Sequence, residues 1–203
     1  MKDVYILGIE SSCDETSVSI VKNGTEEIAT VIASQIDIHK DFGGVVPEIA
    51  SRQHVKNVTM VLEECMEKAN MKMENIDAIA ITYGPGLIGS LLIGLETAKT
   101  LSFVHNKPLI PVHHIAGHIY ANSLVKEMKF PLLAVVVSGG HTELIEMKKD
   151  ELVKVVLESG DEQIFAPNLK KLNGLSLELL ADVNYDEIGD RNRLRPKKII
   201  SKS

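Results

Sequence analysis

The chain has few of the features that mark secreted, membrane-spanning or nucleic-acid-clamping proteins. It has two cysteines, Cys13 and Cys65, too few for a disulfide framework and without metal-site spacing. Acids outnumber bases by 28 to 22, and the net charge of −6 excludes a basic nucleic-acid clamp as the main design. No run reaches the roughly 18 uncharged apolar residues of a membrane helix, and the start lacks a signal-peptide pattern. We therefore expect a cytoplasmic protein with reduced cysteines.

What is present fits an ordinary globular α/β protein. Hydrophobic residues make up 44% and charged residues 25% of the 203-residue chain. Apolar or alternating runs predict strands at 4–9, 16–21, 27–33, 76–83, 109–112, 132–137 and 142–148. Helical spacing predicts helices at 48–69, from a glycine loop at 84–90 to about 105, and around 114–118. This order predicts a mixed α/β lobe over 1–128 and the start of a second lobe at 129–150.

The chain changes character after residue 150. Strand and helix periodicities weaken there, and residues 191–203 carry six Lys or Arg and no acid. We expect 151–203 to be a divergent, weakly structured segment with one helix near 175–181 and a solvated basic tail. If the tail instead contacted nucleic acid, the affinity would fall steeply with salt.

Two histidines have the spacing of metal ligands. His114 and His118 are four residues apart, so on a helix they share one face and can chelate one transition-metal ion. The alternative is that they are polar-face or core residues. A third ligand must come from elsewhere, and imidazole suits zinc, iron or nickel alike. A zinc protease would carry Glu after the first histidine, where this chain has Ile115, so the protease hypothesis is weak. His113 is interpreted as packing or supporting the pair.

Three loops at strand ends could bind a nucleotide. Gly84-Pro85-Gly86 and Ser138-Gly139-Gly140-His141 each follow an apolar strand, and glycine lets backbone N–H groups approach a phosphate. Each alone is more often a structural turn, and neither matches a Walker or dinucleotide pattern. The polar loop at 10–16 joins the first two strands and could orient a phosphate, a metal or a water. Cys13 in that loop has no sequence feature of an activated nucleophile.

Five motifs, taken together and in order, resemble one family. They are Glu10-Ser11-Ser12-Cys13-Asp14-Glu15-Thr16; Gly43 to Glu48 with Ala50-Ser51-Arg52-Gln53-His54; Gly84-Pro85-Gly86-Leu87; His113 to His118; and Val137 to Glu143. Over about residues 3–148 the chain resembles the TsaD (Gcp) family of the actin, hexokinase and Hsp70 (ASKHA) superfamily. The resemblance implies a two-lobed ATP-binding fold and transfer of threonylcarbamoyl from threonylcarbamoyl-AMP to the exocyclic amine of adenosine 37 in tRNAs that read ANN codons.

The resemblance also implies site residues and partners. His114 and His118 would be metal ligands, for iron or zinc, and Asp14 and Glu15 match acidic positions implicated in activity. The adenylate, or ATP, would be bound by Val137, Ser138, Gly139, Gly140 and His141. The partners implied are tRNA, a catalytically inert paralogue (TsaB-like) and a small ATPase (TsaE-like), with a homodimer or heterodimer also conceivable and no membrane.

The chain departs from the family pattern after Glu143. The family continues with an Asp-Asp-Ala-x-Gly-Glu-Ala stretch, a Pro-Gly-Gly-Pro turn and an Asp that completes the metal site, and none of these is found here. A frameshift, a truncated gene model or a replaced end would explain the difference, and we expect the chain alone to be inactive. The rival hypothesis is a non-catalytic scaffold module that pairs with a paralogue; a sugar or acyl kinase of the same superfamily is a third.

Overall fold

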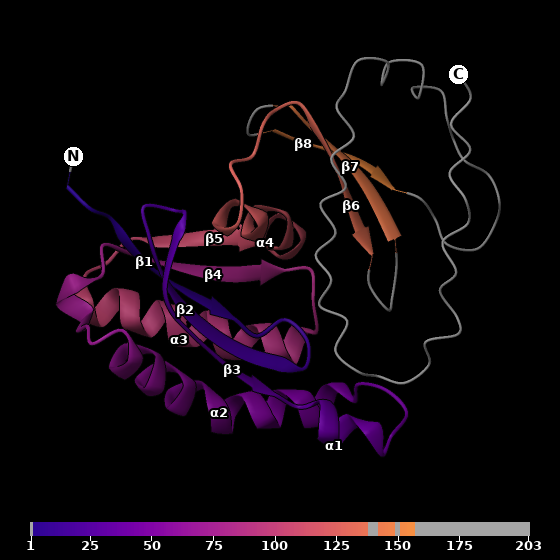
Figure 1. The fold of residues 1–203 in the computed structure, drawn as a ribbon. Helices are drawn as coiled ribbons and strands as arrows, with labels where there is room; N and C mark the ends of the chain where they lie inside the picture. The colour runs from indigo at the N-terminus through magenta and orange to yellow at the C-terminus, as the bar shows by residue number, and fades with distance from the viewer. Residues whose placement is uncertain (1, 138–141, 149–150, 157–203) are drawn as a thin grey trace.

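The computed structural model describes residues 2–137, 142–148 and 151–156, and these form two sheets with helices around them (Figure 1). The strands are β1 (Tyr5–Glu10), β2 (Glu15–Lys22), β3 (Glu26–Ser34), β4 (Ala78–Gly84), β5 (Leu109–His113), β6 (Leu132–Val137), β7 (Thr142–Lys148) and β8 (Glu151–Val156). The helices are α1 (Ile36–Lys40), α2 (Pro47–Lys68), α3 (Ile88–His105) and α4 (His114–Ala121), with short 3-10 turns η1 (Met73–Asn75) and η2 (Asn122–Leu124). None of these helices is both long enough and apolar enough to cross a bilayer.

The first sheet brings three strand ends to one edge. Its strand order is β3-β2-β1-β4-β5, with β1, β2 and β3 antiparallel and β1, β4 and β5 parallel. The carboxyl ends of the parallel strands, at Glu10, Gly84 and His113, therefore lie at the same edge. In open α/β sheets ligands bind outside this edge.

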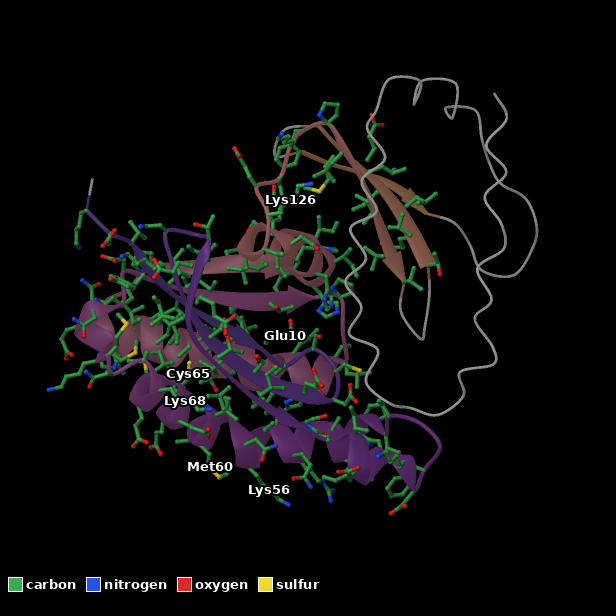
Figure 2. The ribbon with its side chains drawn as sticks, viewed as in Figure 1. Glu10, Lys56, Met60, Cys65, Lys68 and Lys126 are labelled. Carbon is green, nitrogen blue, oxygen red and sulfur yellow. The ribbon has the colours of Figure 1, made fainter. Side chains whose placement is uncertain are left out.

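Helices α2 and α3 cover one face of the first sheet. The face carries Leu7, Ile9, Val18, Ile20, Ile79 and Ile81, all at most 3% exposed. Val61 and Cys65 of α2 and Ala98 of α3 complete this core. Figure 2 shows the two faces of α2, with Cys65 on the face toward the sheet and Lys56 and Met60 on the outer face. Alternation along each strand sends the other residues, such as Gly8 and Ser19, to the opposite face.

Helix α4 belongs to a second core. Ile115 and Ile119, which are one residue beyond His114 and His118, pack with Leu132, Ala134, Ile145 and Met147 of the second sheet. The same helix also contacts β4 and β5 of the first sheet. The histidine-bearing helix therefore lies between the two sheets.

Most of the predicted elements agree with the structure, and two elements were missed. No element is predicted between residues 33 and 48, but Ile36–Lys40 forms the helix α1, whose five residues are too few to show periodicity. The second sheet also continues past residue 148 into β8, in an order β6-β7-β8. Helix α2 begins at Pro47, one residue before the expected start, because proline suits the first helical position. The helix expected near 175–181 and the basic tail lie outside the described residues.

Candidate active site

A cavity of about 290 Å³ lies at the shared edge of the parallel strands, on the face of the first sheet not covered by α2 and α3. Glu10 and Thr82 line it from β1 and β4, and His114 and His118 line it from α4. Small residues such as Gly8 and Gly117 keep it open. The cavity therefore joins the polar end of the sheet to the histidine-bearing helix.

The structure brings the two predicted ligand histidines together. Nε2 of His118 lies 3.1 Å from Nε2 of His114, and the rings meet edge to face with centroids 4.4 Å apart. Zinc–nitrogen bonds of about 2.0–2.1 Å in tetrahedral geometry would separate two ligand nitrogens by about 3.4 Å. The pair thus fits two corners of a metal site after a small adjustment. Within residues 2–137, 142–148 and 151–156, no group of three or more His, Cys, Asp or Glu side chains has the geometry of a metal site.

Glu10 fixes the orientation of His114. Its Oε2 lies 3.3 Å from Nδ1 of His114, and the Ser12 Oγ lies 3.1 Å from the same nitrogen. A hydrogen on Nδ1 can be donated to the carboxylate, which leaves the Nε2 lone pair facing His118. Burial raises the pKa of Glu10, but hydrogen bonds from His114, Ser12 and Thr82 outweigh it and lower this pKa to about 2. Glu10 is therefore a carboxylate at neutral pH.

The loop after β1 is packed tightly on the start of α3. Ser11 donates from Oγ to the Ser90 carbonyl at 2.8 Å, and the Leu87 N–H donates to the Ser12 carbonyl at 2.7 Å. A Cβ at Gly86 would lie only 2.6 Å from that Ser12 oxygen. The glycine of the predicted loop is thus needed for close approach of protein backbone at this position.

The acidic residues expected from the family pattern lie in the same turn. Asp14 ends the β1–β2 connection, its carbonyl accepting from the Gln35 N–H at 3.0 Å, and Glu15 begins β2. The loop residue that touches His114 is Ser12, two positions earlier than Asp14. Desolvation around the sulfur and the neighbouring Asp14 raise the pKa of the Cys13 thiol to about 12, which argues against a nucleophilic role.

The predicted adenylate residues are only partly described. Val137 ends β6 and is 43% exposed, whereas Ser138, Gly139, Gly140 and His141 lie outside the described residues. His113 lies edge to face with Tyr83, with ring centroids 6.0 Å apart, and is not one of the two facing histidines.

Sequence reasoning did not assign a role to Glu10 as the partner of His114. The sequence feature that could have identified Glu10 is its position at the end of a buried strand, because the carboxyl ends of parallel strands meet at one edge of the sheet. Pairing it with a residue 104 positions later required the strand order, which periodicity does not provide.

The fold and site define the class of protein: an α/β protein with a mixed sheet and a pair of facing histidines at the carboxyl edge of its parallel strands. A crystal structure of an uncharacterized Pseudomonas aeruginosa protein described as similar to the peptidase YeaZ matches with a TM-score of 0.50 at 16% identity, over 78% of this chain and 71% of that one. At this identity the match shows the fold alone.

The sequence then gives the family. The model of the TsaD family, tRNA N6-adenosine threonylcarbamoyltransferase, matches residues 26–178, so the chain belongs to this family. The match runs past residue 148, where the recognisable motifs end.

Curated relatives carry the same name. The protein of that name from Anoxybacillus flavithermus is 63% identical over 161 residues, covering 79% of this chain and 47% of the relative. The protein of that name from Listeria monocytogenes is 56% identical over 187 residues, covering 92% of this chain and 54% of the relative. The chain thus spans about half the length of the curated relatives it matches.

Proposed function

We propose that the chain is the first-lobe part of a tRNA adenosine threonylcarbamoyltransferase, moving threonylcarbamoyl from its adenylate to the exocyclic amine of adenosine 37. The observation that carries the proposal is the His114–His118 pair, with Nε2 atoms 3.1 Å apart, at the carboxyl edge of the sheet of a TsaD-family chain. The names of the relatives favour this transferase over a scaffold module without catalytic activity.

The histidine pair would hold one iron or zinc ion. Such a metal supplies Lewis-acid polarisation of the mixed anhydride that carries the threonylcarbamoyl group. His114 and His118 present two nitrogens, while Glu10 accepts the Nδ1 hydrogen of His114 and keeps Nε2 available. A further ligand has to come from outside the described residues, since those residues contain no third donor in place.

The remaining site residues would bind and orient the substrates. Asp14 and Glu15 are proposed as catalytic acids of the loop beside the cavity, and Val137 to His141 as the segment that holds the adenylate. The exocyclic amine of adenosine is a poor nucleophile, so much of the rate acceleration should come from holding it near the activated carbonyl.

The proposed partners are tRNA, an inert paralogue and a small ATPase, and the proposed location is the cytoplasm. The likeness of fold to a YeaZ-like structure supports a paralogue of similar shape. Exposed apolar side chains on α2 and α3 support contact with another protein. Val55 and Met60 of α2 are 59% and 63% exposed, and Ile88 and Leu92 of α3 are 77% and 47% exposed.

The test supplies the rest of the protein. The chain is combined with the carboxyl half of the Listeria monocytogenes relative, a paralogue, the ATPase, donor adenylate and unmodified tRNA, and modified adenosine is measured. Modification is expected, and the double change His114→Ala, His118→Ala should reduce it by about 100-fold or more, with His105→Ala as the control. Absence of modification, or full activity of the double variant, would overturn the proposal.

A further inference from the structure

Two buried histidines other than His114 and His118 lie beside the loop at residues 10–16, which carries Asp14 and Glu15. His54 of α2 is fully buried and His39 of α1 is 4% exposed. Both belong to the segment after β3, whose motif at 43–54 carries part of the family resemblance without an assigned role. Polar groups that are buried this deeply have to be paired, so their partners indicate what they hold in place.

His54 binds the loop on both ring nitrogens. Its Nε2 lies 3.0 Å from the Cys13 carbonyl, and its Nδ1 lies 2.8 Å from the Thr16 Oγ1. The carbonyl can only accept, so Nε2 carries the hydrogen, and Nδ1 of the neutral ring accepts from the Thr16 hydroxyl. The two contacts bracket Asp14 and Glu15, one before and one after.

His39 supports the same loop through Gln35. The Gln35 backbone N–H donates to the Asp14 carbonyl at 3.0 Å, while the Gln35 Oε1 accepts from Nε2 of His39 at 3.2 Å. The remaining nitrogen of His39 accepts from the Val46 N–H at 3.3 Å, just before α2 begins. The 35–54 segment therefore contacts the loop at Cys13, Asp14 and Thr16, whereas the start of α3 contacts it at Ser11 and Ser12.

We infer that His54 is a positioning residue: together with Thr16 it fixes the main chain around Asp14 and Glu15, the two proposed catalytic acids, to α2. His39 and Gln35 give a second attachment to the same loop. The claim that the loop is fixed stands on the contacts alone; the claim that this serves catalysis rests on the proposed function.

Burial makes these contacts consequential. Removing the His54 ring leaves the buried Thr16 hydroxyl and the part-buried Cys13 carbonyl without their partner, which makes local opening of the loop at residues 10–17 easier. We expect hydrogen exchange of residues 10–17 to become about tenfold faster in His54→Ala, with residues 26–34 of β3 as an internal reference.

A matched pair of variants at Thr16 separates the loss of the hydrogen bond to His54 from a general unfolding of the protein. Thr16→Val keeps the shape and removes the hydroxyl, whereas Thr16→Ser keeps the hydroxyl. Exchange at 10–17 should accelerate in Thr16→Val and recover in Thr16→Ser. His54→Gln, whose amide can both donate and accept, should recover part of the protection. His105→Gln, at the end of α3, is the control for losing a histidine elsewhere.

Activity measurements distinguish a positioning role of His54 from an effect on folding alone. In the reconstituted transfer assay, kcat per folded protein should fall about tenfold in Thr16→Val and His54→Ala, while KM for tRNA stays within about twofold, and His54→Gln should restore part of kcat. A residue with only a structural role would lower the folded fraction and leave kcat per folded protein unchanged.

The outcomes are distinct. The inference is overturned if hydrogen exchange of residues 10–17 is unchanged in both Thr16→Val and His54→Ala. It is also overturned if this exchange becomes faster while kcat per folded protein stays unchanged. If the unmutated protein transfers nothing, the proposed function fails and the positioning role with it; the exchange data then decide only whether His54 fixes the loop.

Discussion

The carboxylate of Glu10 lies 3.3 Å from Nδ1 of His114, and this contact joins the end of β1 to the first residue of α4. It connects two residues 104 positions apart in the chain and aims one histidine at the other.

Glu10→Gln should therefore weaken metal binding without removing a ligand. The amide keeps the shape but not the charge that favours a hydrogen on Nδ1 of His114. We expect the affinity for zinc to fall by about 10- to 100-fold, measured by competition with a chromophoric chelator. Glu26→Gln, at the start of β3, is the control. Unchanged affinity in Glu10→Gln would contradict a supporting role for this carboxylate.

Glu10 should also make stability depend on acid pH. The folded-state pKa is about 2, below the ordinary 4.5, so the ionised group contributes stability that is fully present above pH 4.5 and is lost as pH falls toward 2. Urea unfolding in the presence of EDTA at pH 6 and pH 3 should show a larger loss for the unmutated protein than for Glu10→Gln. Equal losses would argue against the depressed pKa.

The two cysteines should react slowly with alkylating reagents. Desolvation, followed by the Asp14 charge, raises the pKa of Cys13 to about 12, and burial raises that of Cys65 to about 11. Iodoacetamide at pH 8 should modify the folded protein much more slowly than the urea-unfolded protein, as measured by mass spectrometry. Rapid labelling of folded Cys13 at pH 8 would refute the raised pKa.

Gly86 and Gly44 form a matched pair for backbone packing. A Cβ at Gly86 would lie 2.6 Å from the Ser12 carbonyl oxygen, whereas a Cβ at Gly44 meets nothing within 4 Å. Gly86→Ala should lower the free energy of unfolding by about 1–3 kcal/mol because backbone has to move. Gly44→Ala should change it by less than about 0.5 kcal/mol. Chemical denaturation measures both, and equal effects would count against the close approach.

The sequence predicted the helices and strands that have strong periodicity. The alternation in residues 16–21 and the apolar spacing of Val58, Val61 and Cys65 reflect burial on one face, which is a local property of the chain. α1 escaped prediction because five residues hold too little periodicity, and the contacts that support it come from Gln35 and His39.

The candidate site was predictable only where its residues are neighbours on one element. The i, i+4 spacing of His114 and His118 identified the pair because helical geometry alone brings the two rings together. Glu10 and His54 act through partners far away in the chain, Glu10 through His114 and His54 through Cys13, so their roles depend on strand order and on the packing of α2. Such contacts leave no periodic signal in a single sequence.

The placement of α4 between two cores has a mechanical consequence. Each histidine is followed directly by an isoleucine, and Ile115 and Ile119 are held in the cluster formed with the second sheet. Because His114 directly follows β5 and α4 also contacts β4, the helix is attached to both sheets. A rotation of the second sheet that keeps this cluster intact would therefore strain the Glu10–His114 contact, and metal affinity would depend on how the two sheets are placed relative to each other.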